Sequence, residues 1–153
     1  MLFFVIPHRF MKIAVINGPN LNLLGRRRPE IYGTETLADT ISDVRNRFPE
    51  VEIVDFQSND EGRLVDAVQT FGFDPEITGI VLNPGAYSHY SLAIADAVEA
   101  IPAPVVEVHI SNIHAREDFR HTSVTARNAK AVIAGCGRLG YQLAVDYLMR
   151  ING

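Results

Sequence analysis

Short apolar runs alternate with amphipathic segments along the whole chain. Residues 12–17, 51–56, 77–82, 105–110 and 131–134 are rich in Val and Ile and are mostly bounded by turn-forming residues, which predicts five buried strands. Residues 34–48, 58–71, 88–101 and 139–151 repeat apolar positions at helical spacing, which predicts helices between the strands. Residues 58 and 61 have the spacing of a capping box. In the polar segment 111–130 we expect at most one short helix.

Five nearly continuous apolar strands separated by amphipathic helices predict a parallel sheet covered on both faces. The simplest doubly wound arrangement of five strands is an α/β, flavodoxin-like sheet of order 2-1-3-4-5. The 153 residues suit one domain, which we place at residues 11–153 after an N-terminal extension, residues 1–10. That extension, MLFFVIPHRF, lacks the basic leader and the small-residue cleavage site of a signal peptide.

Charge and composition narrow the classes of function. With 14 Lys and Arg against 18 Asp and Glu, the net charge of −4 argues against a nucleic-acid partner held by bulk charge. Since apolar runs fall short of the roughly 18 residues that span a bilayer, we expect no membrane association. The one cysteine excludes an intramolecular disulfide and a Cys-rich zinc site, and it favours the reducing cytoplasm.

Polar and basic side chains follow the first, third and fourth predicted strands. Ligands of doubly wound sheets bind beyond the carboxyl ends of the strands, so these side chains should meet at one edge. Together they predict a polar, cationic site for a small hydroxylated anion. The groups are Asn17, Asn20, Asn22, Arg26, Arg27, Arg28, Tyr32, Asn83, Ser88, His89, Glu107, His109, Ser111, Asn112, His114, Arg116 and Arg120.

Most of these groups also have a purely structural interpretation. The run of arginines from 26 to 28 is typical of a solvated loop, and Tyr32 of a packing residue with a wet hydroxyl. Glu107 and His109 lie two apart on a strand and share one face, as a structural pair would. Glu107, His109 and His114 match no zinc spacing, so we expect no metal.

The stretch Gly135-Cys136-Gly137-Arg138-Leu139-Gly140 matches the dinucleotide fingerprint G-x-G-x-x-G. That fingerprint belongs to a first βαβ unit and has an acidic residue about 20 positions further on. Here the chain ends 13 residues after Gly140 without another strand. We therefore predict a tight turn and close helix–sheet packing at these glycines. A nucleotide or flavin binder is a weaker alternative.

Three ordered motifs carry a resemblance to a known family. Residues 17–33 (NGPNLNLLGRRRPEIYG), 83–96 (NPGAYSHYSLAIAD) and 107–120 (EVHISNIHAREDFR), with GCGRLGY near the end, resemble type II 3-dehydroquinate dehydratase over residues 11–150. The resemblance implies a hydro-lyase of the shikimate pathway of aromatic amino-acid biosynthesis. Water would leave 3-dehydroquinate by anti elimination through an enolate, without metal or organic cofactor. The implied partners are further copies of the chain, in a homo-oligomeric dodecamer that is built from trimers.

The resemblance assigns five catalytic roles. Tyr32 corresponds to the base that removes a proton beside the ketone, and Arg27 to the arginine that keeps the tyrosine ionised. Asn20 helps to stabilise the enolate oxygen. His109 corresponds to the acid that protonates the departing hydroxyl, oriented by Glu107.

A second set of positions matches the substrate-binding residues of the family: Asn83, His89, Asp96, Ile110, Ser111 and Arg120. The backbone of Ile110 and Ser111 corresponds to a cradle for the carboxylate, and Asp96 to an aspartate offered to a neighbouring subunit. The other three would hold hydroxyls of the substrate.

The implied base is physically reasonable. A free phenol has a pKa of about 10, so ionising one near pH 7 requires roughly 4 kcal/mol. One guanidinium about 4 Å away supplies about that much at an effective dielectric constant near 20. Lys12 and Lys130, the two lysines, both precede strands and so lie at the opposite edge, which argues against a lysine imine.

Two positions depart from the family pattern. Arg28 stands where Glu is common, and Ala95 where an arginine often precedes the aspartate. Fold alone does not give function, so the alternative is a non-catalytic flavodoxin-like module that binds a small hydroxylated carboxylate.

Overall fold

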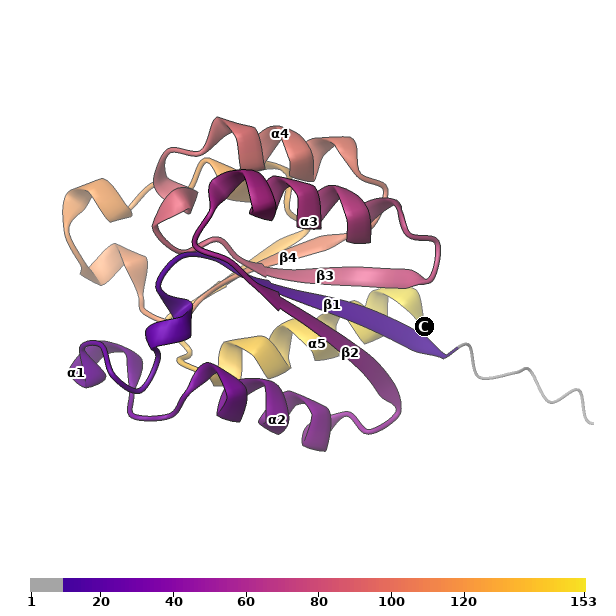
Figure 1. The fold of residues 1–153 in the computed structure, drawn as a ribbon, viewed down its shortest axis with the longest axis horizontal. Coiled ribbons are helices and arrows are strands. Elements are labelled where there is room, and N and C mark those ends of the chain that lie inside the picture. Colours follow the sequence, from indigo (N-terminus) through magenta and orange to yellow (C-terminus); the bar gives the residue numbers. More distant parts are fainter. Residues whose placement is uncertain (1–9) are drawn as a thin grey trace, which may run out of the picture.

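The computed structural model describes residues 10–153 and contains one five-stranded parallel sheet. The strand order is β2-β1-β3-β4-β5, so the predicted α/β class and strand order are confirmed (Figure 1). The strands are β1 (Met11–Asn17), β2 (Val51–Gln57), β3 (Ile77–Asn83), β4 (Val105–His109) and β5 (Ala131–Ala134). Except for Phe10, the predicted extension 1–10 lies outside the described residues.

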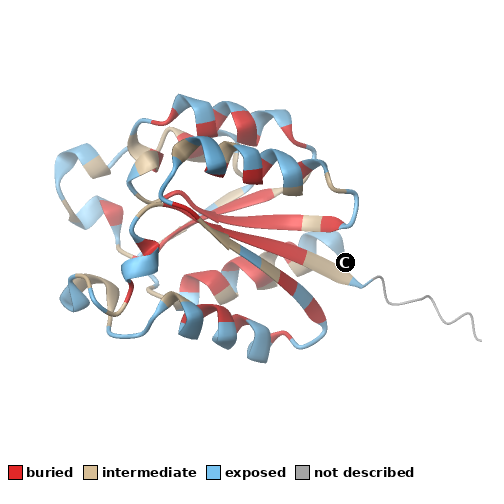
Figure 2. Cartoon of the chain, in the orientation of Figure 1, coloured by how far each residue is buried: buried red, intermediate tan, exposed pale blue. Residues whose placement is uncertain are grey.

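Four helices cover the two faces of the sheet (Figure 1). Helices α2 (Leu37–Arg47) and α5 (Leu139–Asn152) cover one face, and α3 (Glu61–Phe73) and α4 (Leu92–Ala100) cover the other. Along β1, Ile13 and Val15 face the first pair of helices, whereas Ala14 and Ile16 face the second. Because both faces of the strand are buried over residues 13–16 (Figure 2), this stretch is apolar throughout instead of alternating.

Three helices begin later than the sequence predicts, and the first of them is α2, which begins at Leu37 instead of residue 34. The capping box expected at Ser58 and Glu61 is wrong, because the side chain of Asp60 accepts a hydrogen bond from the amide of Arg63 and caps α3. Helix α4 begins after Ser91, whose hydroxyl accepts from the Ile94 amide. The preceding residues form a short 3₁₀ helix, η2 (Gly85–His89).

The polar segment 111–130 contains three 3₁₀ helices where at most one short helix was expected. They are η3 (Ile113–Ala115), η4 (Asp118–Arg120) and η5 (Thr125–Asn128). Such turns need only local hydrogen bonds, for example from the His114 amide to the Asn112 side chain, and therefore leave little periodicity in the sequence. Together with η1 (Leu21–Leu23), η2 and the short helix α1 (Pro29–Tyr32), η3 and η4 cluster beyond the carboxyl ends of the strands (Figure 1), whereas η5 packs against α4 and β4.

The glycines after β5 form the predicted turn. Gly135 and Gly137 have φ angles of 85° and 59°, and their amides donate to the carbonyls of His109 and Ile110. A β-carbon at Gly140 would lie only 3.2 Å from a side-chain carbon of β4. These two amides are already used within the fold, so the turn differs from a phosphate-binding loop.

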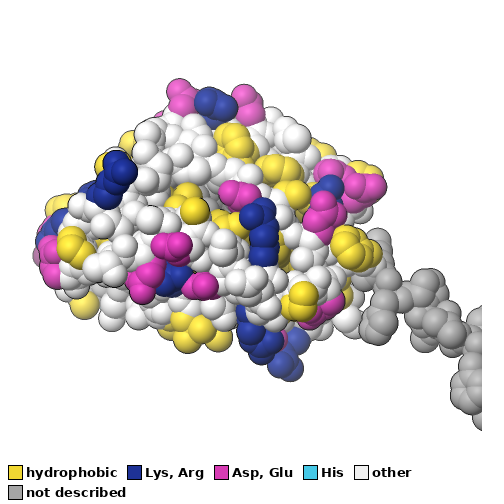
Figure 3. Space-filling view, turned by 60° about the horizontal axis from the view of Figure 1, so that its bottom comes forward, with side chains coloured by type: hydrophobic (Ala, Val, Ile, Leu, Met, Phe, Trp, Pro, Cys, Tyr) yellow, Lys and Arg dark blue, Asp and Glu magenta, His cyan; other side chains and the backbone are white. Residues whose placement is uncertain are grey.

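Within residues 10–153, no helix combines the length and the apolar character needed to cross a membrane. On the face shown in Figure 3, basic and acidic side chains are interspersed. This mixture agrees with the small net negative charge of the chain. A nucleic-acid-binding surface would instead concentrate basic residues.

Candidate active site

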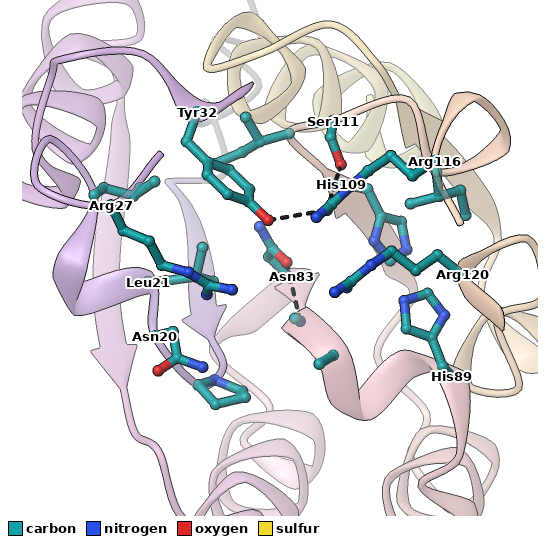
Figure 4. A pocket seen from close by; sticks show the side chains of 16 residues that line it. Asn20, Leu21, Arg27, Tyr32, Asn83, His89, His109, Ser111, Arg116 and Arg120 are labelled. Carbon is teal, nitrogen blue, oxygen red and sulfur yellow. Dashed lines mark hydrogen bonds between the residues drawn. The ribbon is translucent and has the colours of Figure 1, made fainter. Parts of the chain in front are cut away.

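A pocket lies at the carboxyl edge of the sheet, where the loops after β1, β3 and β4 meet (Figure 4). Nine of the eleven residues predicted for the site line it: Asn20, Arg27, Tyr32, Asn83, His89, His109, Ile110, Ser111 and Arg120. The other two, Glu107 and Asp96, do not. Sequence positions more than 90 residues apart therefore share one cavity, because the carboxyl ends of parallel strands lie side by side.

The loop after β1 carries Arg27 and Tyr32 into the pocket (Figure 4). Asn20 and Arg28 adopt left-handed backbone conformations, with φ of 68° and 41°, and help to fold the loop back over the sheet edge. The side chain of Arg28 instead pairs with Glu30 at 3.2 Å and is half exposed. The departure at position 28 thus places a charge outside the pocket lining.

Two guanidiniums flank the phenol of Tyr32. The Cζ atoms of Arg27 and Arg116 each lie 5.6 Å from the centroid of its ring. The hydrogen bond to the phenol oxygen comes from Nη1 of Arg116, at 2.9 Å. The sequence pointed to Arg27 as the partner and gave Arg116 no role beyond its place after the fourth strand.

The guanidinium of Arg116 also has a donor nitrogen that no described residue uses. Its Nη1 lies 3.3 Å from Oγ of Ser111, while its Nη2 is buried and has no acceptor among residues 10–153. A buried donor without an acceptor is costly. The unpaired guanidinium nitrogen is therefore placed to donate a hydrogen bond to an anionic ligand.

His109 and Glu107 form a buried pair at the end of β4. Nε2 of His109 lies 2.6 Å from Oε1 of Glu107, which is completely buried. The carboxylate also accepts hydrogen bonds from Oγ of Ser123, at 2.5 Å, and Oγ1 of Thr125, at 2.6 Å. With three donors, the carboxylate is satisfied as an ion. His109 then donates through Nε2, which leaves Nδ1 as its other ring nitrogen for a ligand.

The sequence gave no signal for Ser123 and Thr125. They lie in the irregular segment before β5, 16 and 18 residues after Glu107. Hydroxyl residues in such a segment are common and have no motif spacing. Their contact with Glu107 arises only when η5 packs beside β4.

The imidazole of His89 is oriented by the backbone. Nδ1 of His89 lies 2.8 Å from the carbonyl oxygen of Thr122. Because a carbonyl only accepts, Nδ1 donates, and Nε2 of the neutral ring is the available acceptor. His89 and Arg120 lie on the side of the pocket opposite Arg27 (Figure 4).

The pocket is cationic. Its described lining contains Arg27, Arg116 and Arg120 and no carboxylate. The nearby carboxylate of Glu117 lies 2.9 Å from Nε of Arg120. A backbone hydrogen bond, assisted by Arg120, lowers the pKa of Glu117. Within residues 10–153, no cluster of three or more His, Cys, Asp or Glu residues forms a candidate metal site.

Asp96 lies on the exposed side of α4 and does not reach the pocket of its own chain. This placement fits a residue offered to another subunit, which stays a prediction. The neighbouring Ala95 is buried.

Comparison with known proteins identifies the family. The family model described as "Dehydroquinase class II" matches residues 11–149. The chain belongs to the class II dehydroquinase family. The chain is 52% identical over 143 residues to the 3-dehydroquinate dehydratase of Bacillus licheniformis, covering 92% of this chain and 97% of that protein.

Solved structures agree with this assignment. The type II dehydroquinase from Butyrivibrio crossotus has a TM-score of 0.88 at 45% identity, covering 91% of this chain and 97% of the other. The type II dehydroquinase from Propionibacterium acnes has a TM-score of 0.86 at 43% identity, covering 91% and 96%. The resemblance seen in the three motifs is thereby confirmed.

Proposed function

We propose that the chain is a type II 3-dehydroquinate dehydratase, a hydro-lyase that converts 3-dehydroquinate to 3-dehydroshikimate in the shikimate pathway. The family match carries the proposal, and relatives about 50% identical bear this name. The pocket supports it, because Tyr32 and His109 line the same cationic cavity. Tyr32 can accept a proton, and His109 can donate one.

Substrate binding uses the charge of the pocket. The carboxylate of 3-dehydroquinate is an anion, and the three guanidiniums and the unpaired Nη2 of Arg116 favour it. Ile110 and Ser111, directly after β4, are the implied cradle for this carboxylate. The remaining polar lining groups, Asn83, His89 and Arg120, are the partners for the ring hydroxyls.

Tyr32 is the base that starts the reaction. The phenolate oxygen takes the proton from the carbon beside the ketone, and the electron pair left behind forms the enolate. Arg116, through its hydrogen bond, and the Arg27 guanidinium beside the ring both place positive charge next to the phenolate. Asn20 and Arg27 are donors of the kind that stabilise the developing enolate oxygen.

His109 completes the elimination. Collapse of the enolate breaks the bond to the leaving hydroxyl, which departs as water with a proton from His109. Glu107, fixed by its hydroxyl donors, holds the imidazole by Nε2 and supplies a negative charge beside the imidazolium. No step requires a metal or an organic cofactor.

Addition of 3-dehydroquinate to the purified protein tests the proposal. The conjugated enone of the product should appear as a rising ultraviolet absorbance, at a rate proportional to enzyme concentration. Saturable binding without product would favour the non-catalytic binding module instead.

The assembly and the location are further parts of the proposal. A dodecamer built from four trimers would give Asp96, exposed on α4, a site in a neighbouring subunit to contact. Light scattering should then report the mass of twelve chains, and a monomer would contradict this role for Asp96. The division into residues 1–10 and 11–153 is supported by the family match, which begins at residue 11. The lone Cys136, exposed in the fold, supports a reducing, cytoplasmic location.

A further inference from the structure

A buried tyrosine lies beneath the pocket and takes no part in the mechanism described above. Tyr141 on α5 is fully buried, and its hydroxyl bridges two asparagines at the ends of neighbouring strands. It donates to Oδ1 of Asn17 at 2.6 Å, and Nδ2 of Asn83 donates to it at 2.9 Å. Asn17 and Asn83 are partners in the register of β1 and β3. Of these three residues, only Asn83 lines the pocket.

The phenol of Tyr141 and the backbone amide of Gly85 together fix which way the Asn83 amide faces. Burial raises the pKa of Tyr141, so the hydroxyl keeps its single proton across the working pH range. Because the hydroxyl donates this proton in its hydrogen bond to Oδ1 of Asn17, the Tyr141 oxygen can only accept from Asn83. At the other end of the amide, Oδ1 of Asn83 accepts from the Gly85 amide at 3.1 Å. Both ends of the amide are thus specified.

We infer that Tyr141 is a positioning residue that acts through Asn83. Its hydroxyl fixes the Asn83 amide with one N–H and one lone pair left for the pocket. A flipped amide would exchange donor and acceptor and would mismatch a substrate hydroxyl. The inference rests on the proposed function, in which Asn83 binds the substrate. A tyrosine that only filled the core would contribute its ring and not its hydroxyl.

Tyr141→Phe separates these roles because it removes the hydroxyl and keeps the ring. We expect KM for 3-dehydroquinate to rise about tenfold, with kcat changing less than about threefold, because a ground-state binding contact is misaligned. Tyr147→Phe is the matched control. It makes the same chemical change on the same helix, beside residues that precede β4 and β5 and so at the opposite edge of the sheet. Its KM should stay at the wild-type value.

A double-mutant cycle with Asn83→Ala shows whether the effect passes through Asn83. Tyr141→Phe should raise KM in the wild-type background and leave it unchanged in the Asn83→Ala background. An equal rise in both backgrounds, or no rise in either, would overturn the inference.

Failure of the proposed function would look different, since the wild-type protein would then form no product. The inference would be judged in that case by NMR of the ¹⁵N-labelled protein. The side-chain amide resonance of Asn83 should shift in Tyr141→Phe and not in Tyr147→Phe, and an unshifted resonance would reject the inference.

Should Tyr141→Phe not fold, Asn17→Ala carries the test from the β1 side. It removes the acceptor of the Tyr141 hydroxyl, so that hydroxyl is free to donate elsewhere. The Asn83 amide can then flip and present Oδ1 to the phenol instead of Nδ2. KM should rise in the same direction, and again only while Asn83 is present. An unchanged KM in folded Asn17→Ala would contradict the inference.

Discussion

Tyr32→Phe is expected to lower kcat by about a thousandfold, within the range of roughly 10² to 10⁴ that a positioned general base contributes. The substitution removes one oxygen from a half-buried ring and leaves the ring between Arg27 and Arg116. Without that oxygen, no group at this position can take the proton beside the ketone. Arg116 loses its acceptor, but it keeps its contact with Ser111.

The initial rate of enone formation at saturating substrate measures this effect. Tyr90→Phe is the control, because Tyr90 is 62% exposed and lies outside the pocket lining. Thermal melting should show both variants folded as stably as the wild type to within a few degrees, since the loss of one hydrogen-bonded hydroxyl from a ring that stays in place costs about 1 kcal/mol. Wild-type kcat in Tyr32→Phe would remove Tyr32 as the base.

His109→Gln is expected to lower kcat by about 10² to 10⁴, because the departing hydroxyl then has no acid to protonate it. Glutamine is chosen because its amide N–H can still donate to the buried carboxylate of Glu107. Alanine would leave that charge without one of its three donors, and loss of stability would obscure the chemistry.

A comparison of leaving groups makes this test specific. A substrate analogue with a better leaving group at the same carbon needs less acid assistance, so His109→Gln should slow it much less than it slows 3-dehydroquinate. His114→Gln is the control, since His114 is exposed, follows β4 as well, and lies outside the pocket lining. Equal slowing of the two substrates would contradict the role of His109 as the acid.

The sequence determined the fold class and most of the pocket lining for a common physical reason. The central strands β1, β3 and β4 are buried on both faces and are therefore mostly apolar, so each was visible as a nearly continuous run. The carboxyl ends of such strands meet at one edge, so the sequence alone placed together the polar residues that follow the strands. Arg27, Tyr32, Asn83 and His109 were located in this way.

Local turns were predicted less well. The start of α3 depends on whether Ser58 or Asp60 supplies the capping oxygen, and both residue types are good caps. The three 3₁₀ helices of segment 111–130 are stabilised by single hydrogen bonds, which impose no periodic pattern on the sequence.

Only the tertiary structure decided which side chains touch one another inside the site. Arg116 and Tyr32 are 84 residues apart, Thr125 and Glu107 are 18 apart, and Tyr141 is 58 residues from Asn83. Hydrogen-bond partners of this kind are selected by the packing of whole elements, and burial makes each pairing strong by excluding water. The sequence alone therefore determined which groups gather at the sheet edge, whereas the packed fold decided which guanidinium meets the phenol and which hydroxyls hold the carboxylate and the amide.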